Sequence, residues 1–437
     1  MNKKIDDILK DTKRGLRTLP GTLLLGPTGA RLWADYLESC PGFVGIFDFI
    51  HKMNIPMLFT IECSAVDTYE PSEFEWYPSH LVMKYISNKI SFTEKKFITW
   101  DDCAVSCQSW KNTGTEAVRL HLVSGNFLQP DATGQSLEGV VSCTLHDYQV
   151  KIVIHTGNTW GNGYLELQPG ERMDFVIAAA FGLDGTDETE TLRGRLEAFN
   201  HNNRETEQVL ARQIREYEEW FSKAPSFESN DPLIDKTWAY RWFILRHNLA
   251  VPAYGNLKYP VFYEGKSHKM GKEAFSPKGW EFCKMVNLTV PMHLLDARWY
   301  QDSSYCMGTL QNMVASQDED GLYHSVYVDK TLASYANFTG WAAYQFFLIC
   351  KDERILEDIL PSLKKQVAGW QNILGNDKDS LIIERVHQRT GKEYQPSYWY
   401  FTNFPDNCRD SSLITPLKRV DRSVYHYLNT LGVAKLC

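Results

Sequence analysis

Short runs of apolar residues alternate with turn signals through residues 20–183 of the chain. Residues 150–155 form a run rich in β-branched side chains, and the turn at residues 168–171 separates two further runs at 165–167 and 173–180. Several short strands joined by regular turns are typical of a β-sandwich. We therefore predict a multidomain protein of the β plus α class that begins with a β-sandwich domain over residues 1–183.

The pattern changes at Gly182. Residues 184–221 are charged and contain no proline, and Leu192, Leu196 and Phe199 recur at helical spacing. This predicts a helical linker over residues 184–224, formed by one long helix or two.

Helical periodicity dominates after Asp231, where Asp231-Pro232 is typical of a helix cap followed by proline in the first turn. The polar turns at residues 318–321 and 351–353 each follow an apolar helical pattern, as in stacked helical hairpins. We predict helices at about 232–250, 280–300, 303–317, 338–350 and 354–374, and a last helix from near Arg419.

Composition and charge narrow the class of partner. Aromatic residues make up 13% of the 437 residues, which fits either aromatic-rich cores or an aromatic-lined cleft for a flat ligand such as a sugar. The net charge of −8 argues against a nucleic-acid partner, which would call for a basic surface. We expect a carbohydrate partner and no nucleic acid.

Neither a cofactor nor a membrane is expected. Cys103 and Cys107 have no second cysteine pair or histidine cluster at zinc-site spacing, so we expect no metal and no other cofactor. No apolar run reaches the length of about 18 residues that a membrane span needs. The charged N-terminal residues lack the apolar core of a signal peptide, which predicts a cytoplasmic location.

The stretch around residue 390 carries the clearest candidate chemistry. A glycine turn sets Glu393 beside Pro396 and the aromatic residues Tyr398 and Trp399. An apolar setting raises a carboxyl pKa, so that the group can stay protonated near neutral pH and donate a proton to a leaving oxygen. Glu393 is therefore a candidate general acid, and the alternative is a solvated glutamate in a loop.

The order of sandwich, linker helix and helical hairpins resembles glycoside hydrolases that have an N-terminal β-sandwich and a six-hairpin α/α barrel. The group spanning family 63, trehalases and mannosylglycerate-hydrolase-like proteins is the most similar, over roughly residues 150–437. Residues 390–396 are similar to its Ser-Gly-x-Asp-x-x-Pro segment, whose acidic residue is the general acid. The resemblance gives that role to Glu393, with Thr390 in place of serine and glutamate in place of aspartate.

Two further stretches carry the resemblance. Trp280-Glu281 looks like the Trp-Asp pair that contacts the sugar in the innermost subsite, with glutamate in place of aspartate. Residues 418–421, Lys-Arg-Val-Asp, look like the His-Val-Asp element that follows the catalytic loop, at a longer spacing from Glu393 than the resemblance suggests.

Other residues are weaker candidates. Asp406 and Asp410 are rivals for the acid role, although aspartate beside asparagine and serine more often forms turns or caps helices. Glu264 lies in a stretch that resembles a cleft loop and is a candidate for a contact with a sugar hydroxyl. Arg298 is a candidate to hold a hydroxyl or orient a carboxylate, and a surface ion pair is the alternative.

The resemblance implies hydrolysis of an α-glucoside or a related sugar with inversion, in which a second carboxyl group activates water. We expect that base beyond Cys437 and a partial barrel over residues 225–437, which leaves open whether the chain is active as it stands. The alternatives are a non-catalytic carbohydrate-binding protein and a sandwich-plus-barrel phosphorylase, in which phosphate replaces the base. The sequence leaves open whether the protein is an enzyme, which sugar and linkage it takes, and its oligomeric state.

Overall fold

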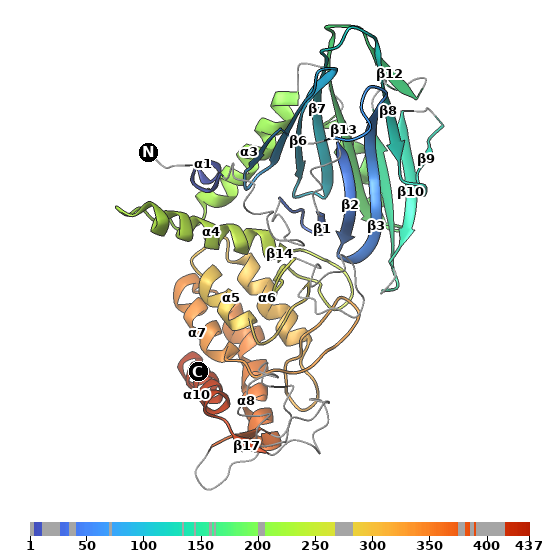
Figure 1. Ribbon diagram of the computed structural model, residues 1–437. Coiled ribbons are helices and arrows are strands. Elements are labelled where there is room, and N and C mark those ends of the chain that lie inside the picture. The colour runs from blue at the N-terminus through green and yellow to red at the C-terminus, as the bar shows by residue number, and fades with distance from the viewer. Residues whose placement is uncertain are drawn as a thin grey trace. The chain divides into compact units, whose positions relative to one another are not determined.

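The computed structural model describes residues 4–10, 27–34, 41–69, 72–132, 135–143, 146–156, 160, 163–199, 206–266, 283–374, 381–384, 389 and 416–437. The chain forms two compact units (Figure 1). The first, the sheet unit, comprises Met1–His247 and Ser267–Glu281. The second, the helical unit, comprises Asn248–Lys266 and Phe282–Cys437.

Two antiparallel sheets make up most of the sheet unit. The five-stranded sheet has the order β1 (Leu32–Ala34), β2 (Gly42–Phe49), β3 (His51–Cys63), β8 (Val118–Ser124), β12 (Tyr164–Leu167). The eight-stranded sheet has the order β4 (Glu73–Trp76), β5 (Leu81–Ile86), β6 (Ile90–Ile98), β7 (Cys103–Asn112), β13 (Arg172–Leu183), β11 (Gln149–His155), β10 (Ser136–Ser142), β9 (Gln129–Pro130). The helices of this unit are α1 (Ile5–Leu9), α2 (Glu188–Glu197), α3 (Thr206–Ser222) and α4 (Pro232–Asn248).

Aromatic side chains fill the space between the two sheets. Phe49 of β2 stacks on Phe181 of β13, with ring centroids 6.1 Å apart. On the same face of the eight-stranded sheet, Phe92 stacks on Tyr85 at 4.1 Å and on Trp110 at 3.9 Å. Because successive residues of a strand point to opposite faces, the intervening residues of these strands lie on the outer face.

A buried carboxylate, Glu94 of β6, links the sheets. Its Oε1 accepts hydrogen bonds from the backbone N–H of Gly42 at 2.6 Å, from Ser106 Oγ at 2.6 Å and from Gln108 Nε2 at 3.1 Å. Its Oε2 lies 3.3 Å from Nζ of Lys96, which in turn donates to the carbonyl oxygen of Gly42 at 2.5 Å. Glu94 and Lys96 are 0% and 1% exposed, so this is a fully desolvated ion pair.

Gly42 is required where β2 begins. Its φ is +87°, and a Cβ atom there would lie 2.5 Å from the carbonyl oxygen of Phe59. Burial raises the pKa of the Glu94 carboxyl, whereas Lys96 and the hydrogen bonds act to lower that pKa. Because residue 42 has no side chain, its backbone N–H reaches Glu94 and its carbonyl oxygen reaches Lys96.

Helices α2 and α3 cover part of the outer face of the eight-stranded sheet. Leu192 and Leu196 of α2 and Val209 and Leu210 of α3 are buried against it. The segment predicted as one or two helices is therefore two helices, and both pack within the sheet unit. The sheet residues beneath them are small or apolar: Phe97, Cys103, Val105, Cys107, Val153, Val176, Ala178 and Ala180.

Helix α4 begins at the predicted cap. The Asp231 carboxylate accepts a hydrogen bond from the backbone N–H of Leu233 at 2.9 Å, and proline occupies the first helical position. In its last turn, the buried guanidinium of Arg246 lies 4.0 Å from the ring centroid of Trp100 and 3.8 Å from the carboxylate of Glu216. These contacts fix α4 against the rest of the sheet unit.

The helical unit confirms the prediction that the chain combines a β part with a separate α part. The prediction of a helix at 280–300 is wrong at its start. Met285 forms a β-bridge with Val326, and the helix begins at Val290. The six-hairpin barrel and the boundaries at residues 183 and 224 stay predictions. The elements are α5 (Val290–Ala297), α6 (Ser304–Ala315), α7 (Thr339–Cys350), the π-helical turn η3 (Ile355–Ile359), α8 (Leu360–Leu374) and α10 (Val420–Leu436), with the strand pairs β14 (Leu249–Ala250) with β15 (Val261–Phe262) and β16 (Ile383–Glu384) with β17 (Leu417–Lys418).

Glycines and amide side chains hold α7, α8 and α10 together. A Cβ atom on Gly432 of α10 would lie 2.3 Å from the carbonyl group of Gly340 of α7, so the two backbones touch. Asn429 accepts from the N–H of Gly340 at 2.8 Å and donates to the carbonyl of Asn337 at 2.7 Å. Gln366 of α8 donates to the side chain of Asn337 at 2.8 Å.

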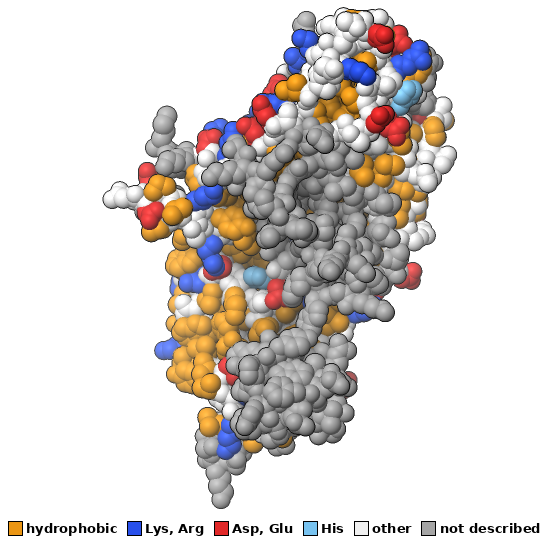
Figure 2. Space-filling model, viewed as in Figure 1, with side chains coloured by type: hydrophobic (Ala, Val, Ile, Leu, Met, Phe, Trp, Pro, Cys, Tyr) orange, Lys and Arg blue, Asp and Glu red, His pale blue; other side chains and the backbone are white. Residues whose placement is uncertain are grey.

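Several apolar side chains of these helices are exposed. On α7, Leu348 is 40% and Ile349 is 43% exposed, and on α10 Val424 is 46% and Tyr427 is 62% exposed. Figure 2 shows hydrophobic side chains gathered over the helices of this unit. In the described part of the chain, no helix combines the length and apolar character that crossing a lipid bilayer demands.

Removing the buried cation should destabilise the sheet unit strongly. Lys96→Met leaves the Glu94 charge desolvated without its partner, so we expect a loss of about 3–5 kcal/mol in the free energy of unfolding, measured by urea titration. Lys84→Met is the matched control, because Lys84 lies on the same sheet and forms an exposed ion pair with Glu73. It should cost less than about 1 kcal/mol.

The double variant Glu94→Gln, Lys96→Met separates the ion pair from its packing. It should recover part of the loss, because no unpaired charge remains. Equal unfolding midpoints for Lys96→Met and Lys84→Met would contradict a structural role for the buried pair.

Helix contact in the helical unit can be tested at Gly432. Gly432→Ala places a methyl group against the backbone of Gly340, so we expect a loss of about 1–3 kcal/mol or more in unfolding free energy. Gly194→Ala is the control, because a Cβ atom there meets nothing within 4 Å. That helical substitution should stabilise the protein by about 0.5–1 kcal/mol, and a loss at Gly194 as large as at Gly432 would refute the packing explanation.

Candidate functional site

Seven of the residues selected from the sequence lie outside the described residues. Their roles stay predictions, whereas Glu264 and Arg298 lie in the described part of the helical unit. The seven are Trp280, Glu281, Glu393, Tyr398, Trp399, Asp406 and Asp410.

The loop that carries Glu264 is held by hydrogen bonds on both sides of it. The backbone N–H of Tyr263 donates to the carbonyl of Asn248 at 3.0 Å, and that of Lys266 donates to the Asn248 side chain at 3.1 Å. The Nζ of Lys266, which is 4% exposed, donates to the carbonyl of Leu249 at 2.5 Å. The loop therefore has a fixed position within the helical unit.

Three backbone segments bring distant residues together beside this loop. The N–H of Glu264 donates to the carbonyl of Lys284 at 3.3 Å. The next residue, Met285, exchanges two backbone hydrogen bonds with Val326, at 3.2 and 3.0 Å. Tyr327 follows on the third segment, so a carboxyl, an ammonium and a phenol are carried by neighbouring segments.

Asn287 fixes the segment that carries Tyr327. Its side chain is fully buried and donates to the carbonyls of Tyr323 at 2.9 Å and Tyr335 at 3.0 Å. Its carbonyl oxygen accepts from Ser325 Oγ at 2.9 Å and from the N–H of Tyr335 at 3.2 Å. All hydrogen-bonding capacity of this amide is used, which positions the loop between α6 and α7.

The side chains of Glu264, Lys284 and Tyr327 form what we call the Glu264 cluster. The Nζ of Lys284 donates to the hydroxyl of Tyr327 at 3.3 Å and lies 4.9 Å from the centroid of its ring. Glu264 is half-buried, and burial raises the pKa of its carboxyl, whereas the charge of Lys284 acts to lower it. A carboxyl, an ammonium and a phenol together can donate to and accept from the hydroxyl groups of a polar ligand.

Arg298 is not part of this cluster. It lies at the end of α5, where its guanidinium donates to the carbonyl of Leu295 and lies 4.8 Å from the ring centroid of Trp299. Burial lowers the pKa of Arg298, and the charge of Asp296 acts in the opposite direction. Among the described residues, no hydrogen bond or ion pair joins Arg298 to the Glu264 cluster.

Sequence reasoning missed Lys284 and Tyr327. Lys284 falls where the sequence pattern predicted a helix, and the contact with Tyr327 depends on a β-bridge between segments about forty residues apart. No local signal marks that bridge. The described ranges also bring together no group of three or more His, Cys, Asp or Glu side chains suited to a metal ion.

No protein-family model and no curated protein sequence matches the chain. Solved structures do resemble it. A putative kojibiose phosphorylase from the human microbiome matches with a TM-score of 0.50 and 10% identity, over 80% of this chain and 52% of that chain. A family GH92 inverting mannosidase from Bacteroides thetaiotaomicron matches with a TM-score of 0.44 and 10% identity, over 94% of this chain and 60% of that one.

A family GH92 alpha-mannosidase from Bacteroides thetaiotaomicron matches with a TM-score of 0.39 and 10% identity, over 84% of this chain and 57% of that chain. The likeness to the putative kojibiose phosphorylase shows the fold of this chain. The chain spans about half of the length of that structure, 52%. The narrower resemblance to family 63 and trehalases stays a prediction.

The electrostatics of the Glu264 cluster can be measured directly. Lys284→Met removes the positive charge that opposes the effect of burial, so the pKa of Glu264 should rise further. A carbon-13 NMR titration of the glutamate carboxyl carbons measures this pKa, and Glu264→Gln assigns the resonance. Lys330→Met, at a neighbouring exposed lysine, should leave the pKa unchanged. An unchanged or lower pKa in Lys284→Met would show that Lys284 does not act on Glu264.

Proposed function

We propose that the protein binds a carbohydrate and acts at a glycosidic bond, as a glycoside hydrolase or a glycoside phosphorylase. The observation that carries this proposal is the fold shared with the putative kojibiose phosphorylase over 80% of the chain. One fold hosts many functions, so the proposal also needs residues with suitable chemistry.

In the hydrolase form of the proposal, Glu393 protonates the leaving oxygen of an α-glucoside or a related sugar. In the sequence Glu393 follows Gly391 and precedes the aromatic residues Tyr398 and Trp399, and an apolar environment of this kind would raise its carboxyl pKa. Water attacks the opposite face of the sugar ring, so the product has inverted configuration. Asp406 and Asp410 are the rival donors.

The Glu264 cluster supports a sugar-binding role for the helical unit. A half-buried carboxyl with a raised pKa can accept or donate a hydrogen bond, and Lys284 and Tyr327 add donors beside it. In this proposal Glu264 holds a sugar hydroxyl, and the predicted sugar contacts of Trp280 and Glu281 are a separate part of the proposal. Arg298 orients a hydroxyl at a separate position.

The phosphorylase form is favoured by the likeness in fold to a putative kojibiose phosphorylase. In that reaction inorganic phosphate takes the place of the attacking water, and the released sugar leaves as a sugar phosphate. The two forms therefore differ in whether turnover depends on phosphate and in the product.

The test is an assay of the whole chain on a panel of α-linked glucose disaccharides, with and without inorganic phosphate. Proton NMR identifies the first anomer of the released sugar or sugar phosphate, and inversion predicts the β form. Glu393→Gln should reduce turnover by about 10²–10⁴-fold, because it removes the proton donor.

Glu357→Gln is the control, because Glu357 is an exposed glutamate of η3. Its turnover should equal that of the unchanged protein. Undiminished turnover in Glu393→Gln would remove Glu393 from the acid role. Calorimetric binding of the disaccharide without turnover by the unchanged protein would favour the non-catalytic alternative.

A further inference from the structure

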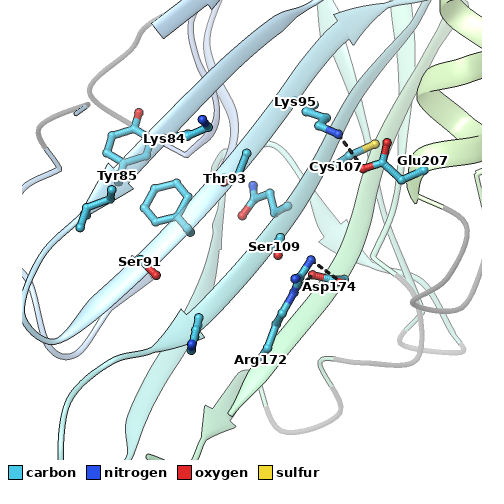
Figure 3. Close-up of a pocket in the computed structure, with 14 residues that line it drawn as sticks. Lys84, Tyr85, Ser91, Thr93, Lys95, Cys107, Ser109, Arg172, Asp174 and Glu207 are labelled. Atoms are coloured by element: carbon cyan, nitrogen blue, oxygen red, sulfur yellow. Dashed lines mark hydrogen bonds and ion pairs between the residues drawn. The ribbon is translucent and has the colours of Figure 1, made fainter. Parts of the chain in front are cut away.

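A polar depression lies on the outer face of the eight-stranded sheet, beside the start of α3 (Figure 3). It has a volume of about 370 Å³ and is lined by residues of β5, β6, β7, β13 and α3. The side chains that give it its character are Lys84, Thr93, Lys95, Ser109, Lys111 and Arg172.

The outer face changes from apolar to polar at one level on adjacent strands. On β7, Cys103 and Val105 lie under α2 and α3, whereas Ser109 and Lys111 line the depression. Strand β13 changes in the same way. Val176 lies under the helices, and Asp174 and Arg172, which precede it at alternate positions, line the depression. Helix cover ends where the polar side chains begin, so the depression is a distinct surface and not an uncovered part of the core.

Strand register arranges these side chains in two rows. In one row Ser91 of β6 lies opposite Lys111 of β7, which lies opposite Arg172 of β13. Paired strands are about 4.8 Å apart, so Lys111 and Arg172 place two positive charges side by side. Like charges directly opposite each other on a sheet are unfavourable. An anion between them would relieve this repulsion.

The second row supplies hydroxyl groups. Thr93 of β6 lies opposite Ser109 of β7, with Lys84 of β5 beyond Thr93 and Asp174 of β13 beyond Ser109. At the rim, Ile86 of β5 is 66% exposed. Two hydroxyls flanked by an ammonium and a carboxylate can both donate to and accept from the hydroxyl groups of a sugar.

The charges of the depression do not balance. Four lining cations face two lining carboxylates, Asp174 and Glu207. Lys111 forms no ion pair in the part of the chain that the structure describes. The other three cations are paired: Lys84 with Glu73 at 2.5 Å, Lys95 with Glu207 at 2.6 Å and Arg172 with Asp174 at 3.2 Å.

The aromatic side chains of these strands face the other way. Tyr85, Phe92 and Trp110 stack on one another inside the sandwich, and Trp110 is fully buried. Tyr85 and Phe92 contribute to the floor of the depression, but they are only 4% and 3% exposed and so offer little stacking surface for a flat base. Hydroxyl groups and an unpaired cation suit a ligand that is rich in hydroxyls and carries an anionic group.

We propose that this depression binds an acidic saccharide, with its carboxylate or sulfate at Lys111 and Arg172 and its hydroxyls at Thr93, Ser109 and Asp174. Its carbon-bound hydrogens contact Ile86. This site belongs to the sheet unit alone and is independent of any bond cleavage by the helical unit.

The test is isothermal titration calorimetry of the whole chain with tetrasaccharides. The probes are oligogalacturonate, its fully methyl-esterified form and a chondroitin sulfate tetrasaccharide, with sodium sulfate as the free anion. An acidic tetrasaccharide should bind, and its affinity should fall as salt is raised. The methyl ester and free sulfate should bind at least tenfold more weakly, because each lacks either the charge or the hydroxyl-rich body.

Lys111→Met should weaken binding at least tenfold, and Ser109→Ala should weaken it by a smaller factor. Lys89→Met is the matched control, because Lys89 is an exposed lysine in the adjacent β5–β6 turn that does not line the depression, and it should bind as the unchanged protein does. Binding of no acidic probe, equal binding of the methyl ester, or full binding by Lys111→Met would each overturn the proposal. Glycoside turnover should be the same in Lys111→Met, so failure of this site is distinguishable from failure of the proposed activity.

Discussion

A carboxylate enclosed between two β-sheets must find a partner for each of its oxygens, and Glu94 imposes this requirement on the sheet unit. The Gly42 backbone, Ser106, Gln108 and Lys96 meet it. A slip of one residue in β6 would move every side chain to the other face and carry Lys95 inside in place of this pair. The pair therefore fixes which residues face outward, and with them both the helix-covered surface and the polar depression.

In the helical unit, neutral asparagine groups fix the positions of loops and helices. Asn248 ties down the loop before and after Glu264, and Asn287 holds the loop that ends in Tyr327. Asn337 and Asn429 join α7, α8 and α10, and the backbones of α7 and α10 touch at glycines. Buried amides can satisfy several backbone groups without the desolvation cost of a charge, and so they position loops at low cost in stability. The Glu264 cluster depends on two of these amides.

The sequence predicted the elements that local signals define. Short apolar runs bounded by turn signals marked β11 and β13, and the Asp231 cap with its proline marked the start of α4. The start of α5 could not be predicted, because the preceding residues have helical composition and the bridge from Met285 to Val326 is a long-range contact. For the same reason Lys284 escaped notice as a neighbour of Glu264.

The two rows of the depression were equally hidden, since they combine residues from four strands between Lys84 and Arg172. Each strand alone shows an ordinary amphipathic pattern. Only the register, which is set by contacts across the sheet, turns separate lysines and serines into one surface. Motifs such as the one around Glu393 can be recognised along the chain, whereas sites assembled by pairing cannot.

The complete hydrogen bonding of Asn287 has a consequence for how the protein can be produced. Asn287-Leu288-Thr289 is an acceptor sequence for N-linked glycans, and Asn337-Phe338-Thr339 is another. Both asparagines are buried, at 0% and 2% exposure, and both amide hydrogens of Asn287 are donated to carbonyls. A glycan on that nitrogen would replace one of these hydrogens and require an opening to solvent. In a secretory compartment that glycosylates proteins, glycosylation of Asn287 therefore competes with folding. A chain with a glycan on Asn287 cannot adopt this fold.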